Sequence, residues 1–480
     1  MAGITAYGAY IPFNRLDRRR LTEAFGEPAP PGEKAVANYD EDSVTMAVEA
    51  ARDCLNGLSP AALSGVYFAT TTPPYREKQS ATTVAAALDA PENVRTADFT
   101  STLRAGSTAL LAAADAARAD GGSVLVAVAD CRPAAAKGHF EQLFGDAAAA
   151  FVVGTENVLA EIEGWCSVAG DVLTQWREAE DRYVRTWEER FITSRGYAPL
   201  VTRALASLAA KLQLTPADIK KIALYAPSPR YHTGMALALG FRQDQTQDGL
   251  FDRVGLAGAA HAPLLLAAAL EEAEPGDRIL MVTFGEGAEA ILFRATEKIK
   301  DFSPRRGVSG HLASKKNTMN YLTYLRWKNM LDFEPPRRPD PDRPSAPAMW
   351  RNARRNLAFY GSRCNRCGTP QIPAQRVCVH CQARDEMAPY RFADLSARIA
   401  TYTIDHLTFS HDPPVVFAVV DFEGGGRLLC EMTDCDPGRV EIGMEVEMTF
   451  RRLYRAGGIH NYYWKARPRR FVAGEKSEQP

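Results

Sequence analysis

Hydrophobic residues in the first 298 positions form two kinds of pattern, short continuous runs and helical spacing. The run 123–129, SVLVAVA, is apolar throughout, which is typical of a strand buried on both faces. Similar patterns predict strands at 65–70 and 148–153 and helices at 41–55 and 105–119. Asp42 or Ser43 is a suitable N-cap for the first of these helices. This alternation of strands and helices predicts an α/β fold.

Two segments of this region share one pattern. Residues 123–154 contain SVLVAVAD…FGDAAAAFVVG, and residues 278–295 read RILMVTFGEGAEAILFRA. In each, a buried strand leads through an FG-x-x-A-x-A turn into a second apolar strand. The pattern predicts a duplicated architecture, with halves at 1–160 and 161–298. The alternative is that any two buried hairpins in an alanine-rich protein look alike.

The pattern changes after position 298. Residues 299–350 hold a basic piece, an aromatic piece and then EPPRRPDPDRPSAPAMW, whose prolines exclude a long helix or central strand. We expect a linker that packs on its neighbours, because its aromatic side chains would otherwise be exposed. Residues 389–472 contain four strand-like runs separated by turn residues, which predicts a small all-β barrel. The runs are ARIATYTIDHLTF, PVVFAVVDFE, GRLLCEMTD and EVEMTFRRLY.

Composition narrows the class of protein. The chain has 480 residues, enough for two or three domains, and a net charge of −1. A net charge this close to zero gives no electrostatic reason to expect nucleic acid or an anionic membrane as a partner. The N-terminus has no signal-peptide pattern, and no apolar stretch is long enough to span a bilayer. We therefore predict a cytoplasmic protein.

Four of the nine cysteines form one cluster. Cys364, Cys367, Cys378 and Cys381 make two C-x2-C pairs separated by ten residues, the arrangement in which four thiolates converge on one zinc ion. Because all four positions are cysteine, the predicted zinc site is closed and structural. His380 lies within the second pair, but four thiolates already suffice. Two disulfides are the alternative, which a reducing cytoplasm disfavours.

The stretch 96–113, TADFTSTLRAGSTALLAA, predicts a strand that turns sharply into a helix. Many enzymes carry a nucleophile at such a turn, because the helix N-terminus stabilises negative charge. Here the turn carries Leu103, which cannot attack a substrate. Ser101 and Thr102 precede it, but a hydroxyl would need a base within hydrogen-bond reach.

Several motifs resemble known families. GITAYGAYIPFNRL, GEKAVANYDEDSVTMAVEAA, APENVRTADFTSTLRAGSTAL and GDAAAAFVVG resemble the thiolase superfamily, in its hydroxymethylglutaryl-CoA synthase and ketoacyl synthase III branch. The resemblance implies a duplicated five-layer αβαβα fold that acts on CoA thioesters. GSRCNRCGTPQIPAQRVC and LLCEMTDCDPGRVEIGMEV resemble the zinc-ribbon and OB-fold protein that accompanies thiolases. This implies a zinc ribbon at 351–388 and an OB-fold at 389–472.

The catalytic positions depart from this family. Its enzymes form an acyl-thioester on cysteine, and a glutamate or a histidine–asparagine pair activates the carbon nucleophile. An ungapped match of the cysteine motif to 97–106 aligns Leu103 with the cysteine, and Thr71 aligns with the synthase glutamate. The histidine falls near Ala226 or Pro227, and the asparagine falls on Leu256. Without a thiolate the chain is not expected to run acyl transfer alone.

Three other residues are candidates for a replacement. Ser101 and His261 are the two catalytic candidates, the latter because it follows Leu256 in the motif around the catalytic asparagine. His232 is a second histidine candidate, and Cys131 is expected to be a buried thiol rather than a displaced nucleophile. Each histidine or hydroxyl also has a purely structural interpretation, as a cap or a hydrogen-bonded side chain.

Three functions fit these observations. The first is an acyl-CoA-binding subunit of a carbon–carbon bond-forming or bond-cleaving complex, in which a partner thiolase supplies the cysteine and the zinc-ribbon/OB part bridges the two. The second is a self-sufficient retro-aldolase or Claisen-type lyase, which needs a base and an oxyanion hole but no acyl-enzyme. In either case the family resemblance implies a homodimer or a higher hetero-oligomer.

The third function is a non-catalytic scaffold or a nucleic-acid-binding OB protein. The motifs RRLYR and KARPRR, with Tyr462, Tyr463 and Trp464 nearby, are typical of a single-strand binding surface. The near-neutral net charge argues against nucleic acid as a partner. The same basic residues, among them Arg467, Arg469 and Arg470, would equally suit the phosphates of CoA.

Overall fold

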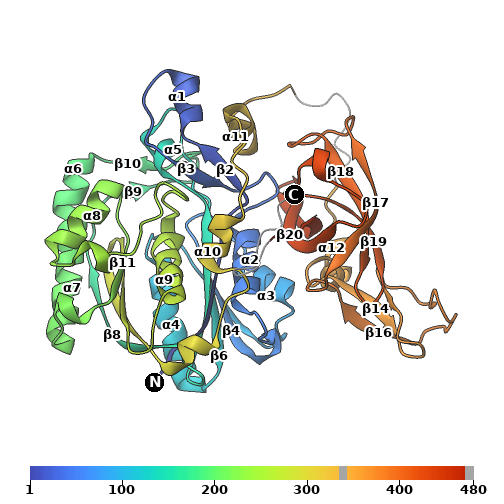
Figure 1. Ribbon diagram of the computed structural model, residues 1–480, viewed down its shortest axis with the longest axis horizontal. Helices are drawn as coiled ribbons and strands as arrows, with labels where there is room; N and C mark the ends of the chain where they lie inside the picture. Colours follow the sequence, from blue (N-terminus) through green and yellow to red (C-terminus); the bar gives the residue numbers. More distant parts are fainter. Residues whose placement is uncertain (335–342, 471–480) are drawn as a thin grey trace.

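A nine-stranded mixed sheet runs through the first part of the chain (Figure 1). The computed structural model describes residues 1–334 and 343–470. The strand order is β11-β12-β13-β8-β1-β7-β6-β4-β5, and only two residue pairs join β8 to β1. The sheet therefore consists of two halves. Its strands are β1 (Gly3–Tyr10), β4 (Leu63–Ala69), β5 (Arg95–Phe99), β6 (Ser123–Asp130), β7 (Ala147–Gly154), β8 (Ala160–Ala169), β11 (Lys221–Leu224), β12 (Arg278–Gly285) and β13 (Gly287–Ala295).

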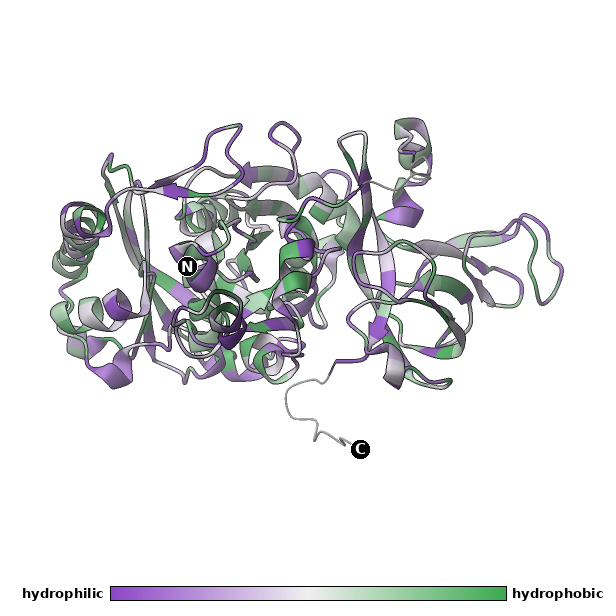
Figure 2. Ribbon diagram, turned by 90° about the horizontal axis from the view of Figure 1, so that it is seen from above, coloured by the Kyte–Doolittle hydropathy of each residue, from purple (hydrophilic) through white to green (hydrophobic). Residues whose placement is uncertain are grey.

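Helices lie between the two halves of the sheet and outside each of them. α9 packs on strands of both halves, and α4 packs on β4, β6 and β7. α2 and α3 cover the outer face of the first half, and α7 covers the second. These five layers confirm the predicted αβαβα fold, and hydrophobic segments gather in the middle of this body (Figure 2). The helices are α2 (Ser43–Cys54), α3 (Ala81–Leu88), α4 (Ala105–Asp120), α7 (Ala198–Leu212) and α9 (His261–Glu271).

The two halves repeat one unit, as the sequence predicts. α4 precedes the antiparallel hairpin β6–β7, and α9 precedes the antiparallel hairpin β12–β13. In each unit the first hairpin strand also pairs in parallel with one further strand, β4 or β11. Helices cover both faces of these strands, α4 and α2 on β6 and α9 and α7 on β12, which explains the continuous apolar runs. Shorter elements join these units: β9 (Gln175–Trp176), β10 (Arg185–Thr186), α5 (His139–Leu143), α6 (Glu189–Phe191) and α8 (Pro229–Ala238).

The N-terminus of α2 is fixed by the predicted cap. The Asp42 carboxylate accepts hydrogen bonds from the backbone N–H groups of Val44 and Thr45, both at 3.0 Å. The Thr45 hydroxyl in turn accepts from the N–H of Asp42 at 2.8 Å, which completes a capping box. This reciprocal cap positions α2 at the boundary with the C-terminal part of the chain.

The helices of the described residues are too short for a membrane. The longest, α4, has 16 residues. Within 1–334 and 343–470, no helix has both the length and the apolar character needed to cross a bilayer.

The segment after β13 packs on the five-layer body. α10 lies against β1 and α9, and α11 contacts α1. Tyr321 and Tyr324 of α11 belong to a small core with Leu16 and Val36. Residues 335–342 of the predicted linker, and 471–472 of the predicted barrel, lie outside the described residues. The elements here are α1 (Arg19–Phe25), β2 (Asn14–Asp17), β3 (Glu33–Val36), α10 (Gly307–Ala313), α11 (Tyr321–Trp327), α12 (Ala346–Arg351) and α13 (Ala353–Asn356).

Two small sheets form the C-terminal part of the molecule (Figure 1). A three-stranded sheet of order β15-β14-β16 carries the cysteine pairs, and a five-stranded sheet of order β19-β18-β17-β20-β21 forms the predicted all-β barrel. The last strand, β21, was not among the four predicted runs. The strands are β14 (Tyr360–Cys364), β15 (Pro370–Gln371), β16 (Met387–Arg391), β17 (Ala397–Asp405), β18 (Val415–Phe422), β19 (Arg427–Glu431), β20 (Glu445–Ala456) and β21 (Ile459–Pro468).

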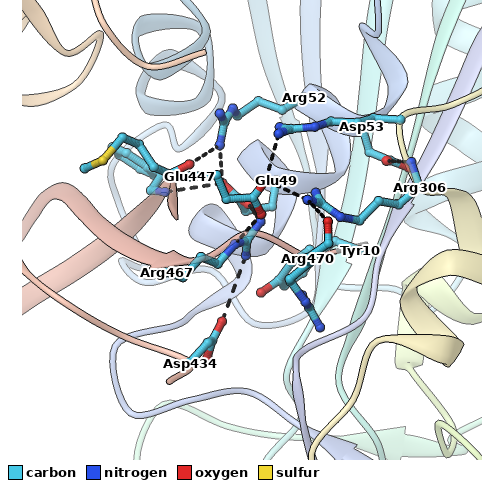
Figure 3. Close-up of polar contacts among 12 residues, drawn as sticks. Tyr10, Glu49, Arg52, Asp53, Arg306, Asp434, Glu447, Arg467 and Arg470 are labelled. Carbon is cyan, nitrogen blue, oxygen red and sulfur yellow. Dashed lines mark hydrogen bonds and ion pairs between the residues drawn. The ribbon is translucent and has the colours of Figure 1, made fainter. Parts of the chain in front are cut away.

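A buried network of charged residues joins the barrel to the five-layer body (Figure 3). Arg467 of β21 is 1% exposed and pairs with Glu49 of α2 and Glu447 of β20, each at 2.8 Å. Arg306, which precedes α10, also pairs with Glu447, at 2.6 Å. The carboxylate of Glu49 in addition contacts Arg52, at 2.9 Å. Alternating cations and carboxylates therefore fill the contact between α2 and the hairpin β20–β21.

The network buries part of the basic and aromatic surface on which the nucleic-acid alternative rested. Arg467 and Arg470 are buried, and Arg470 donates to Ser314 Oγ at 3.1 Å. The Trp464 ring is buried as well, and its Nε1 donates to the carbonyl of Leu357 at 2.8 Å. These side chains bond within the chain and are not available to nucleic-acid or CoA phosphates. The basic and aromatic composition of β21 therefore serves domain docking.

Candidate functional site

The turn that leads into α4 carries Leu103, which is aligned above with the family nucleophile. Leu103 is 8% exposed and belongs to the core of the five-layer body. The backbone of Gly285, at the end of β12, lies so close that a Cβ there would approach Thr102 Oγ1 to 2.5 Å. The turn is therefore held firmly against β12. A hydrocarbon side chain occupies the start of the helix, where it cannot form a thioester.

Ser101 lies at the surface of this turn. Its backbone is left-handed, with a φ of 70°, and its side chain is exposed. The Ser101 hydroxyl contacts the Thr100 hydroxyl at 3.4 Å. Within the part of the chain that the structure describes, no histidine or carboxylate hydrogen-bonds to Ser101. The hydroxyl therefore has no base to activate it.

Asp130, at the end of β6, holds two loops of the candidate site together. Its carboxylate accepts from the backbone N–H of Thr71 at 2.7 Å and from the Thr71 hydroxyl at 2.9 Å. It also accepts from Thr70 Oγ1 at 2.9 Å and from the N–H of Ala259 at 2.8 Å. The close approach requires Gly258, because a Cβ there would lie 2.3 Å from Asp130 Oδ2. Asp130 thus connects the loop of Thr71 to the loop that follows Leu256.

His261 is fully buried at the start of α9. Its Nδ1 accepts from the N–H of Ala257 at 3.4 Å, and its ring lies 6.1 Å from that of Tyr225 and 5.1 Å from that of Phe251. Burial, and secondarily the nearby His232, lowers the pKa of His261 to about 3. The imidazole is therefore neutral at neutral pH and a weak base.

The other candidate positions have no catalytic partner among the described residues. His232 of α8 lies 5.7 Å from the Phe251 ring, and burial lowers its pKa. Ala226 follows β11 and is fully buried. Cys131 lies 3.8 Å from Thr72 Oγ1, and burial raises its pKa to about 12, so it is a thiol and not a thiolate.

Four positions of this chain align with the catalytic residues of the family. The fold brings three of them, Thr71, Leu103 and Leu256, close together. Asp130 joins the loop of Thr71 to the loop of Leu256. The first turn of α4 meets the same loop, because a Cβ on Gly106 would lie 3.2 Å from the carbonyl oxygen of Ala259. Leu103 immediately precedes this turn. At this meeting point the polar groups bond to one another, and the side chains of Leu103 and Leu256 are apolar.

Two carboxylates near this site were missed by the sequence analysis. Asp130 directly follows the buried run 123–129, and an acid at the end of a buried strand was the available signal. Glu289 of β13 is buried and accepts from Arg104 at 3.0 Å and from Ser167 at 3.2 Å. It also accepts from Ser107, in the first turn of α4. No local pattern marks Glu289, because its partners come from two other elements.

The four clustered cysteines lie together at the tip of the three-stranded sheet. Their Sγ atoms are all within 4.8 Å of one another. The Sγ of Cys364 lies 3.6 Å from that of Cys381, and the Sγ of Cys367 lies 3.5 Å from that of Cys378. Tetrahedral Zn–S bonds of about 2.3 Å place sulfur atoms about 3.8 Å apart, whereas a disulfide needs about 2.05 Å. The arrangement therefore fits a zinc ion.

Three family models match parts of the chain. Residues 209–294 match the C-terminal part of 3-oxoacyl-[acyl-carrier-protein] synthase III. Residues 351–387 match the rubredoxin-like zinc ribbon domain of ChsH2, and residues 390–451 match the C-terminal OB-fold domain of ChsH2.

Curated relatives and solved structures agree with these matches. The hydroxymethylglutaryl-CoA synthase of Methanopyrus kandleri is 31% identical over 344 residues, which cover 69% of this chain and 98% of that protein. That of Caldivirga maquilingensis is 31% identical over 342 residues, covering 68% and 98%. A structure of HMG-CoA synthase complexed with CoA matches with a TM-score of 0.61 at 16% identity, over 68% of this chain and 89% of the other. The 3-oxoacyl-[acyl-carrier-protein] synthase III of Aquifex aeolicus matches with a TM-score of 0.54 at 24% identity, over 61% and 100%. The two structures establish the fold.

Proposed function

Because the chain belongs to the hydroxymethylglutaryl-CoA synthase family, we propose that it binds an acyl-CoA thioester as a subunit of a carbon–carbon bond-forming or bond-cleaving enzyme. The thioester is held without transfer of its acyl group to this chain. A partner thiolase supplies the nucleophilic cysteine for the Claisen- or aldol-type step.

The observation that carries this proposal is the apolar start of α4. Leu103 is buried at the point where the family pattern has a cysteine. The Asp130 carboxylate is occupied by bonds from Thr70, Thr71 and Ala259. Neither Ser101 nor His261 has the combination of nucleophile and base that an acyl-enzyme needs. These contacts support a site whose loops are held together as in a binding site but which lacks the nucleophile for an acyl-enzyme.

The C-terminal sheets support the role of a subunit. The matched zinc-ribbon and OB-fold models are both domains of ChsH2. In this chain the hairpin β20–β21 docks on α2 through buried ion pairs, so the barrel is a fixed extension of the five-layer body. We propose that this extension bridges to the partner thiolase, in a homodimer or a higher hetero-oligomer.

Calorimetric titration with CoA and acetoacetyl-CoA, followed by intact-mass measurement, tests the proposal. We expect binding of the thioester and no covalent adduct. A stable adduct would contradict the non-covalent role and direct attention to Ser101 and Cys131. Absence of binding would favour a scaffold. Release of free products by the chain alone would favour a self-sufficient lyase.

A restored cysteine sharpens this test. The variant Leu103→Cys places a thiol at the N-terminus of α4, where the helix dipole favours the thiolate. After incubation with acetyl-CoA we expect Leu103→Cys to gain the mass of one acetyl group. The control Leu103→Ala opens the same space without a thiol and should gain none. An unacylated Leu103→Cys that binds acetyl-CoA would show that the thioester lies elsewhere.

We also propose that Cys364, Cys367, Cys378 and Cys381 hold one structural zinc ion. Elemental analysis of the purified chain should give one zinc per chain, and Cys378→Ser should reduce it. Cys430→Ser is the matched control, because Cys430 is buried like Cys378 but lies outside the cluster, in β19. Equal zinc content in both variants would refute this ligand set.

A further inference from the structure

The loop that carries Thr71 is held at both ends by carboxylates of the five-layer body. This loop, residues 70–80, connects β4 to α3. At its start, the Asp130 carboxylate accepts from the backbone and the hydroxyl of Thr71. At its end, the Asp98 carboxylate accepts from the backbone N–H of Ser80 at 2.6 Å. The middle of the loop receives neither of these bonds.

The barrel supports the middle of the loop. The backbone N–H of His460, in β21, donates to the Tyr75 hydroxyl oxygen at 2.7 Å, and among the described residues this hydroxyl has no other hydrogen-bond partner. The two rings meet edge to face, with 4.8 Å between their centroids, and His460 is 7% exposed. Arg76 donates to the carbonyl of Ala179 in the body, but both residues are exposed, so water competes for these groups. The buried contact is therefore the one that the barrel makes.

Two prolines connect Tyr75 to the candidate site. Pro73 and Pro74 lie between Tyr75 and Thr72, and each proline ring fixes the backbone angle φ. The connection therefore has few rotatable bonds, and a displacement of Tyr75 is passed on to Thr72. The Thr72 hydroxyl donates to the Asp130 carboxylate at 3.1 Å. The position of Tyr75 thus bears on the carboxylate that holds the loops of the candidate site together.

The same strand of the barrel also reaches the N-terminus of α2. The Tyr462 hydroxyl of β21 donates to the Asp42 carboxylate, the cap of this helix, at 2.8 Å. The hydroxyl of the next residue, Ser43, donates to the carbonyl of Thr72 at 2.7 Å. β21 therefore contacts the loop directly and also through the N-terminus of α2, and both contacts require the barrel to be docked.

We propose that Tyr75 is a positioning residue, through which the barrel holds the acyl-CoA site in its binding conformation. This inference rests on the proposed function, the binding of an acyl-CoA, and gives the barrel a role beyond bridging to a partner. The contact between His460 and Tyr75 orders the loop of Thr71 before the thioester arrives, so binding does not have to order it. By thermodynamic linkage, the bound thioester strengthens this contact by the same factor.

Hydrogen exchange of the full-length chain tests this linkage, because the donor of the contact is a backbone N–H. Peptides that contain His460 are followed by mass spectrometry with and without saturating acetoacetyl-CoA. We expect the thioester to slow their exchange by about three- to tenfold, the range that one hydrogen bond contributes. Peptides from β16, in the three-stranded sheet, are the control for general stabilisation and should change less.

The variant Tyr75→Phe removes the acceptor oxygen and keeps the ring. It should weaken the binding of acetoacetyl-CoA by about three- to tenfold in calorimetry and abolish the protection of His460 by the ligand. The matched control is Tyr360→Phe. The Tyr360 hydroxyl of β14 donates to Asp89 of the body, so this variant also removes one hydrogen bond between the C-terminal sheets and the body, but outside residues 70–80. It should leave the affinity unchanged.

Urea titration of both variants separates positioning from a purely structural role. Similar losses of stability, with a loss of affinity in Tyr75→Phe alone, would support positioning. An equal change of affinity in the two variants would assign the contact to domain docking and overturn the inference. The exchange measurement uses the wild-type chain and therefore covers the case that Tyr75→Phe fails to fold.

The outcomes also distinguish this inference from the proposed function. Unchanged exchange of the His460 peptides while acetoacetyl-CoA is bound would overturn the coupling and leave the proposed function intact. Failure of acetoacetyl-CoA to bind the wild-type chain would instead refute the proposed function, and this inference with it.

Discussion

Two buried regions of the molecule hold cations in opposite ways. At the contact between α2 and the barrel, Arg467 has two carboxylates at 2.8 Å. Arg132 and Lys34 line a small cavity between β3 and α11, and neither forms an ion pair with a carboxylate of the described residues. The nearby carboxylates of Asp130 and Asp146 bond to other groups instead. None of the three cationic residues is more than 8% exposed, so the difference lies in the pairing and not in the burial.

The comparison indicates which buried charges serve the fold. A paired charge offsets its desolvation within the chain, and removing one partner leaves the other uncompensated. An unpaired buried cation lowers the stability of the free protein, and this loss is recovered only when an anion binds. Arg467 therefore stabilises the architecture, whereas Arg132 and Lys34 lower the stability of the free chain. Four measurements test this division.

The largest effect is expected from Arg467→Met. The substitution leaves Glu49 and Glu447 without their shared cation, which should lower the free energy of unfolding by about 3–5 kcal/mol. Urea titration followed by tryptophan fluorescence measures this loss. The control is Arg427→Met on β19, whose exposed ion pair with Asp421 should contribute no more than about 1 kcal/mol. Equal losses in both variants would mean that the network contributes nothing beyond a surface pair.

Acid should weaken the same contact. Burial alone would raise the pKa of Glu49, but Arg467 and Arg52 outweigh it and lower this pKa to about 2. Between about pH 4.5 and 2 the unfolded chain binds a proton at this residue that the folded chain does not, so stability falls as pH falls. The contribution of Glu49 lost over this range is about 3 kcal/mol. The stability difference between wild type and Glu49→Gln should therefore shrink on acidification, and a constant difference would contradict the ion pairing.

Alkali should act on the cavity in the opposite sense. Burial lowers the pKa of Lys34 to about 7, below its ordinary value of 10.5. Between these values the unfolded chain holds a proton that the folded chain has released, so this residue destabilises the fold less as pH rises. From pH 7 to 9 wild type should gain about 2 kcal/mol relative to Lys34→Met in urea titrations. A parallel pH dependence of the two proteins would mean that Lys34 has an anionic partner in the free protein.

The sequence predicts what is encoded locally. The apolar run 123–129 predicts β6, Asp42 caps α2, and the spacing of the cysteine pairs brings four sulfur atoms together. Each of these features depends on residues close together in the chain, where periodicity and turn chemistry carry the information. The family motifs extend this to the five-layer fold.

The buried charges could not be predicted in the same way. Arg467 lies in a basic segment that is typical of an exposed surface, and its partner Glu49 is 418 positions away. Asp130 is separated from Ala259 by 129 positions. Nothing in either neighbourhood specifies such a contact, because tertiary packing alone decides which charges meet. The candidate site depends on several contacts of this kind, so its residues were only partly identified.

The smallest effect, and the one of opposite sign, is expected from Arg132→Met. The methionine keeps much of the apolar contact with Phe144 and removes a buried charge whose desolvation outweighs its attraction to Asp130. Gln175, whose side-chain oxygen accepts from Arg132, is partly exposed and can bond to water instead. The free energy of unfolding of the ligand-free chain should rise by about 1 kcal/mol in urea at neutral pH. A loss comparable to that of Arg467→Met would place Arg132 among the structural charges. A gain in stability would show that the chain retains this buried cation at a cost to its own fold.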